Sequence, residues 1–267
     1  MVSLSSSAHL PQTFGKLLLH RAAGLWRALD LGAQVLVLAL TPASYGPGRR
    51  QAYARLVYLD TAPTLPWFTL LCALISLVLT RIVVVTALSY GLSQYALQMV
   101  IRVLVLELIP LTAALFVALR CTLPHGVELR AMRLRGAFDD PGGVGTLPLA
   151  THVLPRVLSG VFATVTLAAL SCVVALVIAY LAVYGFTLSG VPGYTRLFGQ
   201  VFNPSVALIF VLKTLFFSLA ISLIPMIAAL QDGTRRSARS SAEMRALVYM
   251  FVVILLLEGA SLIGNYY

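Results

Sequence analysis

Charged residues are scarce in this sequence. Only 10% of its 267 residues are Asp, Glu, Lys or Arg, whereas 60% are hydrophobic. A soluble domain of this length carries roughly 25% charged residues, so the chain has too little polar surface to cover a water-soluble globule. The mean hydropathy of +0.94 agrees with this. We therefore expect lipid to surround much of the chain.

Familiar catalytic motifs are also absent. The sequence contains no G-x-x-x-x-G-K-[ST], no H-E-x-x-H and no G-x-S-x-G, the patterns of P-loop nucleotide binding, zinc proteases and serine hydrolases. The stretch GAFDDPGGVG lacks the P-loop lysine and is more typical of a turn. The four scattered histidines and three cysteines show no metal-ligand spacing, and an odd cysteine count argues against a disulfide framework. We expect no catalytic residue, no metal site and no cofactor bound by this chain.

Long apolar segments make up most of the sequence. Five of them are close to the roughly 20 residues that a helix needs to cross a bilayer core. They cover residues 66–88, 95–119, 155–184, 204–230 and 247–263. Neither a Pro/Gly/Ser-rich linker nor an internal repeat divides the chain. The sequence predicts an all-α integral membrane protein with five transmembrane helices.

The N-terminal part is amphipathic. Over residues 10–31, Leu and Phe side chains fall on one side of a helix and basic side chains gather opposite, a pattern typical of a helix lying in the membrane interface. The alternative is a helix packed against the rest of the protein. Residues 35–40 continue apolar and suit an elbow dipping into the bilayer. We assign residues 1–55 to this region and 56–267 to the membrane domain, and we expect an uncleaved N-terminus because no basic n-region precedes a short apolar core.

Basic residues are concentrated on one side of the predicted membrane topology. With a cytoplasmic N-terminus, the cytoplasmic segments receive almost all of them, and the opposite side receives only Arg196. This asymmetry follows the positive-inside rule and predicts that a chain with five spans ends with its C-terminus on the opposite side of the membrane. The net charge of +10 therefore indicates topology and anionic headgroups, and no nucleic-acid partner is expected.

Ionisable residues inside the predicted spans are the most informative feature. These are Arg81, Arg102, Glu107, Lys213 and Glu258. A charge at mid-bilayer costs at least a few kcal/mol, so such residues usually face a bundle interior or a watery cavity. They indicate either a polar cavity for a charged or zwitterionic substrate, or pairing among themselves that only holds helices together. For Glu107 and Lys213 both interpretations stay open; Arg102 favours pairing, and Arg81, Arg102 and Glu258 are also placed to snorkel to an interface.

One stretch resembles a known family. LELIPLTAALFVALRCTLPHGVELRAMR, residues 106–133, is similar to the MlaE permease family segment R-E-L-G-P-V-x-A-A-L-x-x-A-G-R-x-G-S, followed by A-E-x-G-x-M-R. The matching positions are Glu107, Pro110, Ala113, Ala114, Leu115, Ala118, Arg120, Glu128, Met132 and Arg133. Residues 154–170 and 212–224 resemble the family's third and fourth spans, with Lys213 on its lysine. Arg245 and Glu258 match a basic residue and an acid of the last span, so the resemblance covers residues 65–264.

The sequence also departs from the family pattern. Leu106 and Ile109 replace the arginine and glycine that flank the acid, and Cys121 to Pro124 replace a small Gly-Ser pair. Beyond Met132, LRGAFDDP stands in place of the family's E-Q-I-D-A-L-like continuation. The departures after Arg120 fall within residues 120–140, which correspond to the family's cytoplasmic coupling segment to the ATPase.

The resemblance implies a specific architecture. Such permeases form dimers of subunits with an elbow helix and five spans, between a cytoplasmic ABC ATPase that binds ATP and magnesium and a periplasmic MCE-domain protein. A phospholipid occupies the cavity at the dimer axis. The residues implied in lipid contact or gating are Glu107, Lys213, Arg245, Glu258, Arg81 and Arg102. Those implied in ATPase coupling are Arg120, Glu128, Met132 and Arg133.

The leading hypothesis is therefore the permease subunit of an ATP-driven phospholipid transporter. The altered coupling segment motivates a second one, a membrane scaffold with the same fold that does not transport. A permease for another hydrophobic substrate is a further alternative. An ion- or proton-coupled transporter is less well supported, because no inverted repeat or pair of broken helices is evident.

Overall fold

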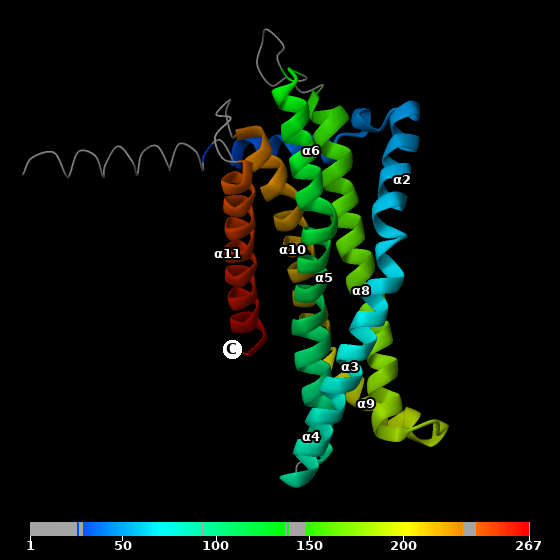
Figure 1. The fold of residues 1–267 in the computed structure, drawn as a ribbon. Helices are drawn as coiled ribbons and strands as arrows, with labels where there is room; N and C mark the ends of the chain where they lie inside the picture. Colours follow the sequence, from blue (N-terminus) through cyan, green and yellow to red (C-terminus); the bar gives the residue numbers. More distant parts are fainter. Residues whose placement is uncertain are drawn as a thin grey trace, which may run out of the picture.

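The chain folds into a bundle of long helices (Figure 1). The computed structural model describes Trp26 and residues 29–91, 93–136, 138, 148–231 and 239–266. Within these residues the structure is helical and has no strand, and five helices are long and apolar enough to cross a membrane. The predicted all-α fold with five transmembrane helices is confirmed.

The helical stretches that carry the candidate spans are Arg49–Ser89, Tyr95–Leu134, Leu149–Tyr184, Pro204–Gln231 and Met244–Gly264. The first comprises α2 (Pro47–Thr61) and α3 (Thr64–Ser89). The second comprises α4 (Ser93–Val100), the π-helix η2 (Ile101–Leu108), α5 (Ile109–Val117), the π-helix η3 (Ala118–Thr122) and α6 (Leu123–Leu134). The third comprises the π-helix η4 (Leu149–Val153) and α8 (Leu154–Tyr184), and the last two are α10 (Pro204–Gln231) and α11 (Arg239–Tyr266).

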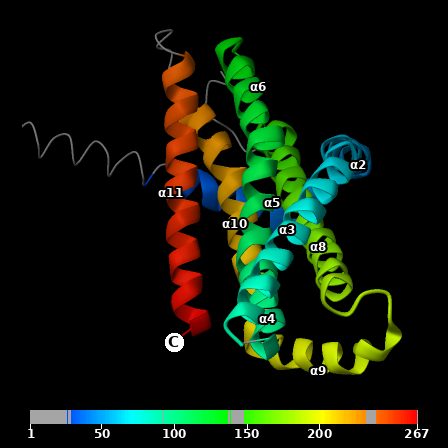
Figure 2. The ribbon, with the colours of Figure 1, turned by 60° about the horizontal axis from the view of Figure 1, so that its bottom comes forward.

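Two of these stretches extend far beyond the apolar segments predicted from the sequence. The polar helix α2 precedes α3, and α6 continues the direction of α5 beyond residue 119 (Figures 1 and 2). Apolar length marks only the part of a helix that crosses hydrocarbon. Polar residues prolong the helix where neighbouring helices still cover it, as the buried His125 and Leu129 of α6 show.

Short helices complete the fold. A helix over Leu29–Leu40 runs crosswise to the bundle (Figure 1), and its Val35 is buried beside Leu129 and Met226. It follows the amphipathic segment predicted over residues 10–31, most of which lies outside the described residues. The 3-10 helix η1 (Pro42–Tyr45) leads into α2. At the opposite end, η5 (Leu188–Gly190) and α9 (Val191–Val201) connect α8 to α10, and α9 lies across the bundle (Figure 2).

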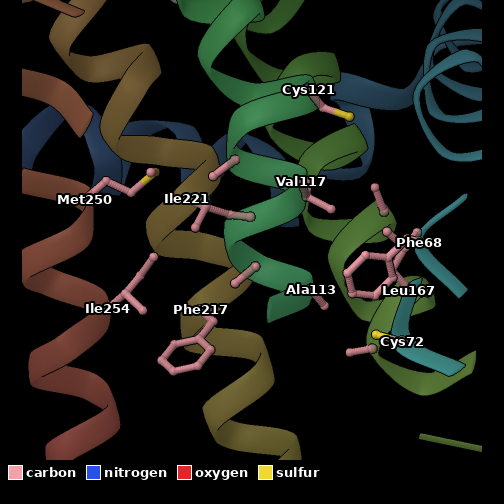
Figure 3. Packing of buried hydrophobic residues seen from close by; sticks show 14 residues of the cluster. Phe68, Cys72, Ala113, Val117, Cys121, Leu167, Phe217, Ile221, Met250 and Ile254 are labelled. Carbon is pink, nitrogen blue, oxygen red and sulfur yellow. The ribbon is translucent and has the colours of Figure 1, made fainter. Parts of the chain in front are cut away.

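The central core joins all five spans (Figure 3). Phe68 of α3 and Leu167 of α8 lie on one side of α5, and Phe217 of α10 and Ile254 of α11 lie on the other. The buried residues of α5 in this core include small ones such as Ala113 and Ala114, which let helix backbones approach closely, as packing in lipid requires. Many large hydrophobic side chains on α3, α8, α10 and α11 are exposed instead. In a membrane protein these are the surfaces that face lipid.

Each π-helix ends two residues before a proline. Pro110 follows η2, Pro124 follows η3 and Pro155 follows η4. A proline inside a helix has no N–H to donate, and its ring clashes with the carbonyl four residues earlier. A π turn inserts an extra residue into the helix and is frequent at functional sites. Its widened backbone relieves this clash and changes the direction in which the following side chains point.

Candidate functional site: a buried ion cluster

Three ionisable residues meet inside the bundle. Lys213 of α10 reaches Glu107 of η2 on one side and Glu258 of α11 on the other. Its Nζ contacts Oε2 of Glu107 and lies 2.8 Å from Oε2 of Glu258. The Lys213 side chain is only 2% exposed, and the two glutamate side chains are 12% and 13% exposed. We refer to these three residues as the Lys213 cluster.

The backbone of η2 completes the coordination of the ammonium. Lys213 Nζ donates a hydrogen bond of 3.3 Å to the carbonyl oxygen of Leu106. That carbonyl lies four residues before Pro110, which has no N–H to offer it. The proline that ends the π-helix thus leaves an acceptor beside Glu107. Lysine, a compact charge with three donors, matches one backbone and two carboxylate acceptors.

The Lys213 cluster is buried among the helices, beside an aromatic ring. The Phe217 ring lies one turn along α10, with its centroid 5.7 Å from Nζ, within range of a cation–π interaction. In such a setting the attraction between opposite charges is strong, but each charge is costly to bury alone. Removing one partner of a buried ion pair typically costs about 3–5 kcal/mol. The cluster is therefore stable as a set, and two carboxylates share one ammonium.

The structure thus brings together three of the residues singled out in the sequence. Pairing between Glu107 and Lys213 is one of the two arrangements expected, and Glu258 joins it. Arg102 shares η2 with Glu107 and is half-buried, and its Nε has no hydrogen-bond partner among the described residues. Arg81 and Arg245 are exposed, on α3 and α11 respectively. Arg245 precedes Glu258 by 13 residues, or about 20 Å along a helix, and lies well away from the cluster.

A second buried polar group lies nearer the α6 end of the bundle. Nε2 of His125 in α6 is 3.4 Å from Oδ1 of Asp60 in α2, and both side chains are largely buried. Ser159 of α8 donates a hydrogen bond to Oδ2 of the same aspartate. Sequence analysis missed Asp60 and Ser159 and left His125 without a role. In the sequence, Asp60 is marked only by its position just before an apolar segment. Its partners could not be predicted, because Ser159 lies 99 residues away in the chain.

The residues expected to couple to an ATPase lie on or next to α6. The chain at this end is helical as α6, and residues 137 and 139–147 lie outside the described part. Glu128 is exposed and pairs at 3.4 Å with Arg156, which also donates to the carbonyl of His152. Arg120 is exposed, whereas Met132 and Arg133 are half-buried. The exposed charges form a polar face at this end of the bundle.

Comparison with protein families identifies the class of the chain. Residues 54–262, well over half of the sequence, match the family model for permease MlaE. The chain belongs to the MlaE permease family. No curated protein matches it significantly. Membership, together with five apolar helices, makes the chain a multi-pass membrane protein of the permease class, and the resemblance seen in the sequence is confirmed. Within the described residues, no three His, Cys, Asp or Glu side chains are grouped as metal ligands.

Proposed function

We propose that this chain is the permease subunit of an ATP-driven transporter that moves phospholipid between the bacterial inner membrane and a periplasmic MCE-domain protein. The observation that carries the proposal is the Lys213 cluster, a set of opposite charges kept inside an apolar bundle. Family membership supports the permease class. The chemistry of the cluster supports a lipid with a charged headgroup.

The Lys213 cluster suits a phospholipid headgroup because it offers both kinds of charge. The ammonium of Lys213 can pair with a phosphate, and Glu107 and Glu258 can pair with a headgroup amine. Without lipid, the ammonium of Lys213 pairs with both carboxylates. A headgroup that replaces these internal contacts can bias the helices toward a second arrangement, because a ligand shifts an equilibrium only through differential contacts.

The same proposal assigns the domains, the membrane orientation and the partners of the transporter. Residues 56–267 form the permease domain, and residues 1–55 form the interfacial region before it. Two copies form the permease dimer, with the N-terminus in the cytoplasm and the C-terminus in the periplasm. An ABC ATPase, which binds ATP and magnesium, docks at the α6 end through Arg120, Glu128, Met132 and Arg133. The MCE protein meets the opposite end, near α9.

A test must separate transport from helix assembly. Lys213→Met leaves two buried carboxylates without their cation and is expected to weaken folding. The triple variant Lys213→Met, Glu107→Gln, Glu258→Gln removes all three charges together and is expected to recover the assembly. ATP-dependent transfer of a fluorescent phospholipid by the reconstituted complex is then measured. We expect the triple variant to assemble and to transfer lipid at least about tenfold more slowly, the equivalent of 1.4 kcal/mol.

Arg55→Met is the matched control, since it removes an exposed charge from α2, outside the cluster. It should transfer lipid at close to the unmodified rate. Full transfer by the assembled triple variant would contradict the proposed role of the cluster. A native complex that assembles fully but transfers no lipid would support the scaffold hypothesis instead, and transfer of a different apolar molecule would reassign the substrate.

A further inference from the structure

The connection between α8 and α9 presents large apolar side chains outside the bundle. We call residues Gly185–Gly190 the far-end finger, because they lie at the end opposite α6. Phe186 is 94% exposed and Leu188 is 84% exposed. In both views the finger swings out sideways from the helices and returns to α9 (Figures 1 and 2). Its apolar side chains are therefore held beside the bundle and away from its core.

The finger is braced in this position. Tyr180 donates a hydrogen bond to the carbonyl of Thr187, whose hydroxyl donates to the carbonyl of Tyr184 at 2.9 Å. Gly185 has a φ of 66°, which favours glycine, and turns the chain out of α8. Gly190 returns the chain so closely past Tyr184 that a Cβ there would lie 2.5 Å from its ring. These contacts therefore hold the segment in a conformation that exposes Phe186 and Leu188.

Three tyrosines fix α9 to the end of α8. The rings of Tyr180, Tyr184 and Tyr194 lie 5.3–6.5 Å apart between centroids, and Tyr194 donates to the carbonyl of Leu176 at 2.8 Å. Burial, with the nearby Tyr184 as a smaller cause, raises the pKa of Tyr194 to about 12, so its phenol stays protonated and keeps this hydrogen bond. Tyrosines of this kind mark the boundary between membrane and water.

The faces of this end differ in polarity. The exposed side of α9 carries Thr195, Arg196, Gly199 and Gln200, which suits contact with water and headgroups. The finger exposes Phe186 and Leu188 instead. Over residues 181–210 the sequence has one charged residue, Arg196, and no acid. Nothing in this segment repels the phosphates of a lipid surface.

The length of α8 places the finger at the level of a lipid headgroup. Its 31 residues span about 46 Å, compared with roughly 30 Å of hydrocarbon. Arg156 lies near its first end, on the same side as α6, so Tyr180 and Tyr184 reach the opposite boundary. A segment that projects sideways from this boundary overhangs the surrounding bilayer. Apolar side chains in such a position reach its acyl region.

We propose that Phe186 and Leu188 insert into the lipid leaflet on the α9 side and form a membrane anchor for the α8–α9 corner. The partner is the headgroup–acyl boundary of the bilayer, where amphipathic elements bury apolar groups about 5–10 Å deep. The anchor fixes the corner to the leaflet while the spanning helices move. This inference does not depend on what the protein transports.

Tryptophan fluorescence tests the insertion directly. The chain has two tryptophans, Trp26 and Trp67, so Phe186→Trp is made in a Trp26→Phe, Trp67→Phe background. The full chain is reconstituted into phosphatidylcholine vesicles brominated at shallow acyl positions. We expect the emission of Phe186→Trp to be blue-shifted and quenched by bromine at least about twofold more than that of Gln200→Trp, the matched control on the polar side of α9.

A spin label provides a second, independent measurement in case the tryptophan substitution itself alters the segment. All three native cysteines are buried, so a spin label on Leu188→Cys or Gln200→Cys is site-specific. Collisions with oxygen should exceed those with a water-soluble nickel complex at residue 188, with the reverse order at residue 200. Equal water exposure at both positions would overturn the proposal. Shielding of residue 188 from both oxygen and bromine would also overturn the proposal. That result would indicate that a second copy or another protein, and not lipid, covers the finger.

Discussion

Lys213 donates its hydrogen bond to Leu106, whose carbonyl lies four residues before Pro110. A side chain of α10 therefore occupies the place of a missing backbone N–H in the neighbouring helix. This contact joins two features that lie far apart in the sequence, a proline within a span and a lysine 107 residues away from Leu106. It also shows that the backbone of η2 is part of the ion cluster.

Replacing Pro110 by alanine should disturb the cluster without removing any charge. The new N–H competes with Lys213 for the Leu106 carbonyl and favours an ordinary α-helix over the π turn. We expect lipid transfer by the reconstituted complex to fall several-fold, with a change in free energy of unfolding of about 1 kcal/mol or less. Pro204→Ala is the control, because Pro204 begins α10 and interrupts no helix. Equal transfer rates for both variants would contradict this account.

Gly160 marks a close approach of α8 to η3 and α10. A Cβ at this position would lie 2.8 Å from Cγ2 of Thr122 and would also overlap the hydroxyl of Ser222. We expect Gly160→Ala to destabilise the protein by about 1–3 kcal/mol through overpacking, seen as a lower melting temperature in detergent. Gly199→Ala on α9 has open space around its Cβ and should melt normally. Adding Ser222→Gly to Gly160→Ala should recover part of the loss, and no recovery would contradict the predicted overlap.

The contact between Asp60 and His125 should behave as a coupled pair. Each single alanine variant leaves the other polar group buried without that partner, at a cost of about 1–3 kcal/mol. A double-mutant cycle on unfolding in detergent is therefore expected to give a coupling energy of at least about 0.5 kcal/mol. Thr195→Ala, on the exposed side of α9, serves as a neutral control. Additive single effects would show that α2 and α6 are not linked through these side chains.

The fold was largely predictable because lipid imposes a simple rule. Only a helix of about 20 apolar residues satisfies its backbone across hydrocarbon, and five such segments are visible in the sequence. The rule says nothing about where polar helices continue, so α2 and the extension through α6 were missed. The rule also does not predict π turns, although each one ends two residues before a proline, at Pro110, Pro124 or Pro155.

The candidate site was predictable in part. Charges are costly inside a bilayer, so Glu107, Lys213 and Glu258 could be singled out, with Arg81 and Arg102, from their positions inside apolar segments. Their mutual geometry could not, because it depends on how η2, α10 and α11 rotate about their axes. Asp60 and Phe186 were missed for different reasons. Asp60 has long-range partners, and Phe186 is notable only because the fold leaves it exposed.

The order of the Lys213 cluster along the chain has a consequence for biogenesis. Glu107 precedes Lys213 by 106 residues, whereas Glu258 follows it by 45. As a chain is made from its N-terminus, α10 must enter the bilayer with one counter-ion already in place and the other not yet synthesised. The arrival of α11 brings the second carboxylate, Glu258, to Lys213, so insertion of the last helix ties it to the two helices already in place.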